Sequence, residues 1–82
     1  MSGENIFMSL PLYSHPDGGT YVIVNDLNVQ MKMEDGSWQP AVYYRRVERS
    51  INGGFVYEGK NHFCTTRERW EQRFTLIGDT RR

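Results

Sequence analysis

The chain of 82 residues contains one cysteine, three prolines and no long apolar run. The single Cys64 cannot form a disulfide within the chain, which excludes the disulfide-stapled folds of small secreted domains. The apolar stretch at residues 6–10 is far too short to cross a bilayer. No basic residue precedes Lys32, so the N-terminus lacks the positive region of a secretion signal. We therefore expect a cytoplasmic protein without a membrane span.

The chain also lacks a net charge, with ten basic and ten acidic residues. A strongly basic protein that coats DNA is therefore not expected. The two signs are unevenly distributed, because residues 1–41 hold one base and five acids while residues 42–82 hold nine bases and five acids. One face of the fold could thus be basic, unless folding interleaves the two halves.

A chain of this size forms one domain at most and buries only a thin core. Apolar residues make up 38% of the sequence and aromatic residues 13%, so the core must rely on large rings. We expect residues 12–77 to form the domain. Residues 1–11 are expected to be a flexible arm or an edge strand, and residues 78–82 a flexible tail.

Turn-forming residues recur at intervals of about ten residues, which is typical of short antiparallel strands. Glycine, proline, Asn and Asp mark turns at residues 15–19, 25–28, 34–37, 52–54 and 59–61. Between them the sequence predicts strands at residues 20–24, 29–33, 38–47 and 55–58, and a last strand at residues 74–77. Val29, Met31 and Met33 alternate with polar residues, which predicts one apolar and one solvated side.

One helical segment is predicted, from Thr65 to about Arg73. The Thr65 hydroxyl could cap the first turn while Glu68 reaches back to the cap N–H. Trp70 should face the core. The fold class predicted is all-β (mainly β): a small SH3-like five-stranded barrel with one short helical turn before the last strand.

Several short motifs resemble a family of bacterial and phage proteins known as a domain of unknown function with an SH3-like barrel (domain of unknown function 1653-like). The motifs are a tyrosine and histidine before a glycine turn at residues 13–19, the Tyr44-Arg45 strand end, the Phe55-Val56 pair with Phe63, and Arg-Phe-Thr-Leu-Ile at residues 73–77. Tyr57-Glu58 stands where the family has a basic-proline pair. The resemblance implies the SH3-like fold and no assigned activity.

The stretch Ala-Val-Tyr-Tyr-Arg-Arg at residues 41–46 places one tyrosine and one arginine on each face of its strand, because alternate residues point to opposite sides. These rings could simply fill a small core and present their hydroxyls at its rim. Alternatively, an aromatic ring beside arginine can stack a base while the guanidinium binds phosphate. The candidate ligand-binding residues are Trp38, Tyr43, Tyr44, Arg45, Arg46 and Tyr57.

Catalysis has little support in the sequence. His62 and Cys64 lack an orienting third group, and a zinc site would need His15 and Asp17 to fold against them. We therefore expect no enzyme activity, no metal and no cofactor. The leading hypothesis is a module that binds a nucleotide or nucleic acid. The alternative is a phage or bacterial accessory protein that binds a host protein, and a homo-oligomer is compatible with either.

Overall fold

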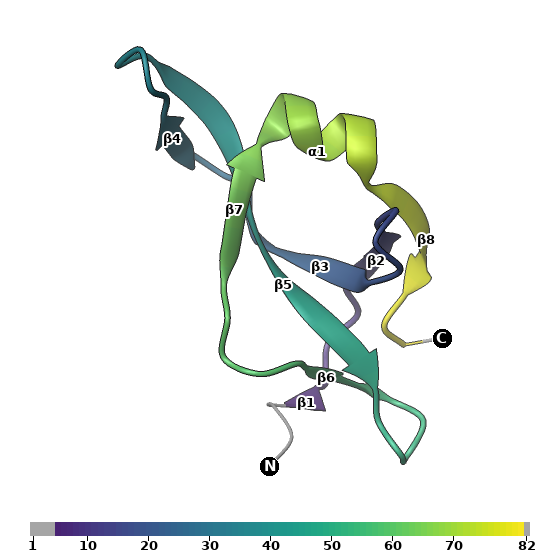
Figure 1. Cartoon of the computed structure of the whole chain (residues 1–82). Coiled ribbons are helices and arrows are strands. Elements are labelled where there is room, and N and C mark those ends of the chain that lie inside the picture. The colour runs from purple at the N-terminus through teal and green to yellow at the C-terminus, as the bar shows by residue number, and fades with distance from the viewer. Residues whose placement is uncertain (1–4, 82) are drawn as a thin grey trace.

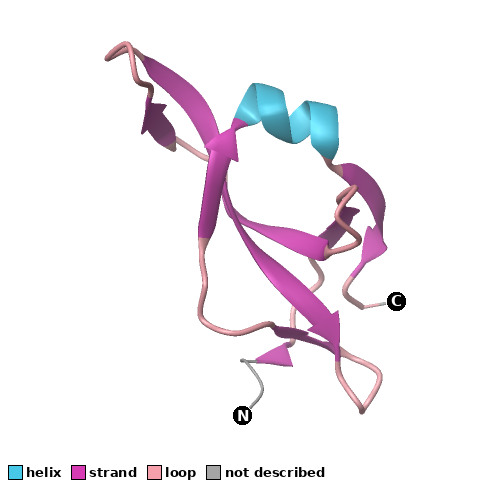
Figure 2. Ribbon diagram, viewed as in Figure 1, coloured by secondary structure: helices cyan, strands magenta, loops and turns pink. Residues whose placement is uncertain are grey.

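A computed structural model describes residues 5–81, which form antiparallel strands and a short helix (Figures 1 and 2). The strands of this part of the chain are β1 (Asn5–Ile6), β2 (Pro11–Ser14), β3 (Thr20–Asn25), β4 (Gln30–Lys32), β5 (Trp38–Arg49), β6 (Phe55–Tyr57), β7 (Phe63–Thr66) and β8 (Thr75–Asp79). The helix α1 (Arg67–Arg73) joins β7 to β8. The mainly-β prediction is confirmed.

The sheet is open. Within residues 5–81 its strands pair in the order β1-β6-β5-β3-β2-β8, and β4 and β7 each pair with β5. The prediction of a closed five-stranded barrel is therefore wrong. The seven-residue α1 connects β7 to β8 and is about 10 Å long, roughly twice the spacing of about 4.8 Å between paired strands. In Figure 1, α1 lies between β7 and β8, the two strands that would have to pair to close the sheet.

β5 is the longest strand and organises the fold. Tyr43 and Tyr44 each pair with a residue of β3 and with a residue of β7, so these two strands lie along opposite edges of β5. The first residues of β5 form a hairpin with β4, and its last residues pair with β6. The predicted alternation in the β4 segment is confirmed, because Val29, Met31 and Met33 are half-buried while their polar neighbours are exposed.

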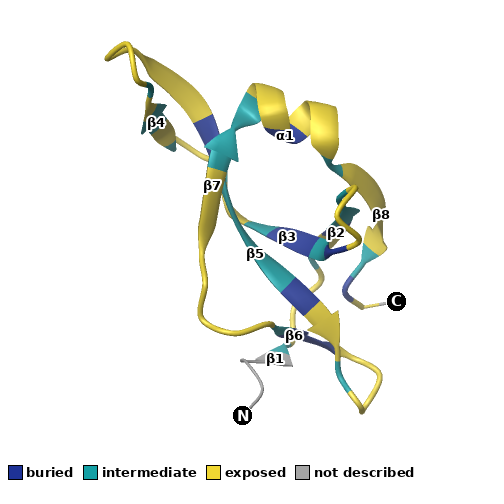
Figure 3. Ribbon diagram, in the orientation of Figure 1, coloured by how far each residue is buried: buried dark blue, intermediate teal, exposed yellow. Residues whose placement is uncertain are grey.

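The two faces of β5 bury two separate apolar clusters. Figure 3 shows buried positions on β3, β5 and β6, and an exposed surface along the β4–β5 hairpin and most of α1. The inner cluster contains Tyr21, Val42 and Trp70, with Tyr13, Ile23, Tyr44 and Phe74 packed against them. The outer cluster contains Leu12, Val22, Val47 and Phe55, with Ile6, Leu10 and Tyr57 packed against them. We call the side of β5 that bears Val42 and Tyr44 the inner face, and the side that bears Tyr43 and Val47 the outer face.

The helix begins one residue later than predicted. Thr66, not Thr65, is the N-cap, and its hydroxyl accepts a hydrogen bond of 3.2 Å from the backbone N–H of Arg69. The β5–β7 ladder continues through Thr66, which pairs with Ala41, so helical conformation starts only at Arg67 and the extended residue placed to cap it is Thr66. The predicted inward orientation of Trp70 is confirmed, since only 5% of its surface is exposed.

The two ends of the described chain are tied together. The Thr80 hydroxyl donates to the Met8 carbonyl at 2.8 Å and accepts from the Leu10 N–H at 2.9 Å. Within the predicted tail of residues 78–82, Gly78 and Asp79 belong to β8 and Thr80 is buried; residue 82, and residues 1–4 of the predicted arm, lie outside the described residues. At the other end Asn5–Ile6 form an edge strand against β6. No helix in residues 5–81 has the length and apolar character needed to span a membrane.

Candidate functional site

The structure divides the six predicted ligand-binding residues among three places. Tyr43 and Arg45 lie on the outer face of β5, and Tyr57 joins them from β6. Tyr44 and Arg46 lie on the inner face. Trp38 lies apart from both groups, at the start of β5 in the hairpin with β4. The alternation predicted for residues 41–47 therefore holds, but it prevents the six residues from forming one surface.

On the outer face, two stacked pairs occupy neighbouring outward positions of β5. The Tyr43 ring stacks on the ring of His62 with centroids 5.3 Å apart and planes 23° apart, and its hydroxyl hydrogen-bonds the His62 Nδ1. The Arg45 guanidinium lies 4.1 Å from the centre of the Tyr57 ring and donates to the Gly59 carbonyl at 3.0 Å. We call Tyr43, Arg45, Tyr57 and His62 the outer patch.

On the inner face, Tyr44 is part of a packed aromatic core. Its ring contacts those of Tyr21, Phe63 and Trp70 at centroid distances of 5.5, 5.5 and 5.1 Å. Burial raises the pKa of the Tyr44 phenol, with a smaller contribution from the Asp17 carboxylate. Tyr44 thus packs in the aromatic core, and Phe63, which is 39% exposed, continues these ring contacts to the surface.

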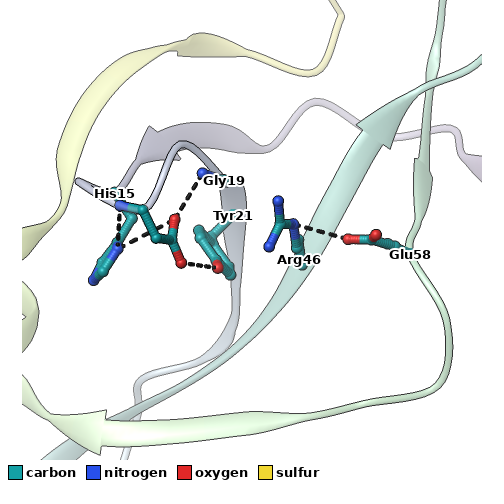
Figure 4. Close-up of polar contacts among 6 residues, drawn as sticks. His15, Gly19, Tyr21, Arg46 and Glu58 are labelled. Atoms are coloured by element: carbon teal, nitrogen blue, oxygen red, sulfur yellow. Dashed lines mark hydrogen bonds and ion pairs between the residues drawn. The ribbon is translucent and has the colours of Figure 1, made fainter.

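Arg46, on the same inner face, is paired with an acid of the neighbouring segment (Figure 4). Its Nε lies 2.8 Å from the Glu58 carboxylate, and its guanidinium lies 5.8 Å from the centre of the Tyr21 ring. Both members of the ion pair are partly exposed, so it adds little to stability. The Glu58 carboxylate also offsets the positive charge that a phosphate would meet here.

The turn between β2 and β3 forms a polar network at the edge of the inner cluster (Figure 4). The Asp17 carboxylate accepts hydrogen bonds from the Gly19 backbone N–H at 2.7 Å and from the Tyr21 hydroxyl at 2.9 Å. The Gly19 bond lowers the pKa of Asp17, partial desolvation opposes this, and the Tyr21 hydroxyl and His15 lower it further. The network fixes Tyr21 in the core, which is a structural role.

A pH-dependent stability follows from this network. Because the folded state lowers the pKa of Asp17, its contribution is present above the unfolded value of about 3.9 and is lost as pH falls through the folded value. We expect Asp17→Asn to reduce the loss of stability between pH 7 and pH 3, measured as the shift in urea midpoint. An unchanged loss of stability at acid pH in Asp17→Asn would contradict the role given to Asp17.

The Asp35 carboxylate, whose pKa is lowered by its hydrogen bonds to Ser37, should supply a separate part of the acid-sensitive stability, which Asp35→Asn removes.

Trp38 is 60% exposed, and the Lys32 ammonium lies 6.0 Å from the centre of its ring. The β4–β5 hairpin that carries it projects away from the rest of the sheet (Figure 1). A groove of about 720 Å³ lies between this hairpin and α1, lined by side chains such as Met33, Gln39 and Arg69. Acids and bases both line the groove, and none of the six predicted residues does.

The residues considered for catalysis or metal binding lie in two separate places, His62 and Cys64 at β7 and His15 and Asp17 in the turn after β2. His62 lies just before β7 and contacts Tyr43, while burial raises the pKa of the Cys64 thiol, which disfavours the nucleophilic thiolate. In that turn, His15 Nδ1 lies 3.2 Å from Asp17 Oδ1. Among residues 5–81 no three potential ligands of the His, Cys, Asp and Glu types come together to hold a metal ion.

In comparisons with known proteins, no family model, curated protein or solved structure matches this chain. The resemblance to the SH3-like family of unknown function therefore remains a prediction. The candidate site has to be judged on its own geometry.

Sequence reasoning missed the role of His62 as the partner of Tyr43. His62 is 19 residues away along the chain, and the pairing of Tyr43 with Cys64 across β5 and β7 brings it close. The Asp17–Tyr21 contact was also missed, because the turn preference of Asp predicts a bond to a backbone N–H such as that of Gly19 and not to a side chain.

Proposed function

We propose that this protein is a non-enzymatic binding module that recognises a nucleotide or a nucleic acid through its outer patch. One observation carries the proposal: the Arg45 guanidinium, stacked on Tyr57, lies next to the Tyr43–His62 pair on the same face of β5. Bases stack on aromatic rings and on guanidinium planes, and arginine binds phosphate. The outer patch combines both types of group.

The surroundings of the outer patch support this choice over the inner face. The loop that follows β6 contributes the exposed Lys60, and His62 itself is exposed. On the inner face, Arg46 is paired with Glu58 and Tyr44 is packed in the core. Lys60 and His62 therefore add an exposed cation and an exposed ring beside Tyr43 and Arg45.

The SH3-like character of the fold is part of the same proposal. β7, β5, β3, β2 and β8 follow one another as neighbours, and α1 precedes β8. This order supports a strongly bent sheet of the SH3-like kind, in which α1 takes the place of the closing ladder. The outer patch then lies on the convex side, away from α1.

The adjacent arginines Arg45 and Arg46 provide a matched test. We expect the protein to bind a fluorescein-labelled 12-nucleotide single strand of DNA or RNA, with affinity falling as salt rises from 50 to 200 mM because phosphate contacts release counterions. Arg45→Gln should weaken binding at least about tenfold, or about 1.4 kcal/mol. Arg46→Gln should stay within about twofold, since its side chain points to the other face.

Fluorescence anisotropy measures both affinities, and circular dichroism confirms that each variant is folded. Equal losses in Arg45→Gln and Arg46→Gln would contradict a site on the outer face. Absence of binding by the unchanged protein to nucleotides and to single strands would overturn the proposed function.

A second candidate function is the recognition of another protein, in the manner of a phage or bacterial accessory factor, and it rests on Trp38. A tryptophan that is 60% exposed on a projecting hairpin is the type of residue that anchors protein interfaces. Native mass spectrometry of the protein purified gently from its natural source would reveal such a partner or a homo-oligomer. A partner that is retained equally by Trp38→Ala would contradict this use of the hairpin.

A further inference from the structure

The outer patch contains two separate stacking platforms. In one, the exposed His62 ring lies on Tyr43, and in the other the Arg45 guanidinium lies on Tyr57. Tyr57 in turn packs against the outer cluster, so the second platform is supported from below by the core. Each platform is a planar group backed by a tyrosine.

Both platforms are attached to β5, one through Tyr43 and the other through Arg45. Tyr43 and Arg45 are two residues apart on the same face, so their side chains leave the strand about 7 Å from each other. This is about twice the stacking distance of about 3.4 Å between successive bases in a duplex strand. Two bases can therefore occupy the platforms when the strand that carries them is opened and its bases are splayed.

The loop between β6 and β7 holds both platforms in place. The Glu58 N–H donates to the Arg46 carbonyl at 2.9 Å, the Gly59 carbonyl accepts from Arg45, and His62 is bonded to Tyr43. Gly59 has a φ of 60°, a left-handed conformation that glycine adopts without strain. Because the loop is fixed to β5 at three successive points, its side chains are already ordered and little conformational entropy is lost on binding.

We propose that the ligand of the outer patch is single-stranded nucleic acid, bound through two adjacent unpaired bases, one on His62 and one on Arg45. This inference rests on the proposed function and narrows it. A mononucleotide can use one platform only. A duplex keeps its bases paired and stacked, so it cannot offer them to either platform.

A length series tests the inference directly. Binding of thymidine monophosphate, the dinucleotide, the tetranucleotide and a 12-base-pair duplex is measured by isothermal titration calorimetry at one salt concentration. We expect the dinucleotide to bind at least about tenfold more tightly than the mononucleotide, the gain of one further base stack.

Variants assign the platforms. His62→Ala should lower the affinity for the dinucleotide to that for the mononucleotide, whereas Arg46→Gln, on the other face, should keep the tenfold difference. Equal affinities for mononucleotide and dinucleotide, or a duplex that binds as tightly as the tetranucleotide, would overturn the inference. If the inference fails in this way but Arg45→Gln weakens the binding of the mononucleotide, the proposed function still stands. If no member of the series binds, the proposed function fails as well.

Discussion

Replacing Trp70 by alanine is expected to remove a large share of the stability of this domain. Trp70 is the buried side chain through which α1 contacts the sheet, and its ring stacks on Phe74 at a centroid distance of 3.8 Å and packs edge-on against Tyr13 at 5.0 Å. Truncation of a buried tryptophan costs about 3–5 kcal/mol. A small domain has a total stability of about 5–15 kcal/mol. Urea unfolding followed by circular dichroism measures the loss.

The second tryptophan supplies the control. Trp38 is 60% exposed and outside both clusters, so Trp38→Ala should change stability by less than about 0.5 kcal/mol. If Trp70→Ala does not fold, Trp70→Phe keeps a ring in the inner cluster and should show an intermediate loss. Equal urea midpoints for Trp38→Ala and Trp70→Ala would show that the inner cluster is not the core of the fold.

Gly19→Ala is expected to destabilise the domain by about 1–3 kcal/mol, the usual cost of overpacking a filled site. A Cβ at Gly19 would lie 2.8 Å from Cε1 and 2.9 Å from the hydroxyl of Tyr21, and 3.0 Å from the Asp17 carboxylate. Tyr21 cannot easily yield, because it is 6% exposed, hydrogen-bonded to Asp17 and packed edge-on against Tyr44 and Phe74. Urea midpoints for the variant and the unchanged protein measure the effect.

Gly54 is the matched control for this substitution. A Cβ there would meet no atom within 4 Å, and its backbone is not in the left-handed region. Gly54→Ala should therefore leave stability unchanged within about 0.5 kcal/mol. A loss in Gly54→Ala as large as that in Gly19→Ala would mean that alanine is disfavoured at both turns for a reason other than contact with Tyr21.

The local features of the fold were predictable because they depend on neighbours in the chain. The turn at residues 34–37 follows from Asp35-Gly36, where Gly36 has a φ of 89°. The inward orientation of Trp70 follows from the repeat of about 3.6 residues in a helix, and the two faces of β5 follow from the two-residue repeat of a strand. The helix start was predicted one residue too early, because Thr65 and Thr66 are equally good caps and the pairing of β7 with β5 decides between them.

The arrangement of the six predicted binding residues was only partly predictable from the sequence. Alternation already assigned Tyr43 and Arg45 to one face and Tyr44 and Arg46 to the other. It could not show that the inner pair is engaged, Tyr44 in the aromatic core and Arg46 by Glu58. Nor could it show that His62 stacks on Tyr43.

The sequence by itself determined the mainly-β class, most of the turns, the position of the one helix in residues 5–81 and the two faces of β5. These depend on residue type, backbone preference and a repeat of two or about 3.6 residues, all of which act over a few neighbours. Only the tertiary structure decided that the sheet stays open, that Thr80 ties the ends together and that Tyr43, Arg45, Tyr57 and His62 form one patch. Those outcomes depend on strand register and on contacts between segments that are distant in the sequence. Many registers and contacts are compatible with the same local patterns, so the sequence alone does not select one of them.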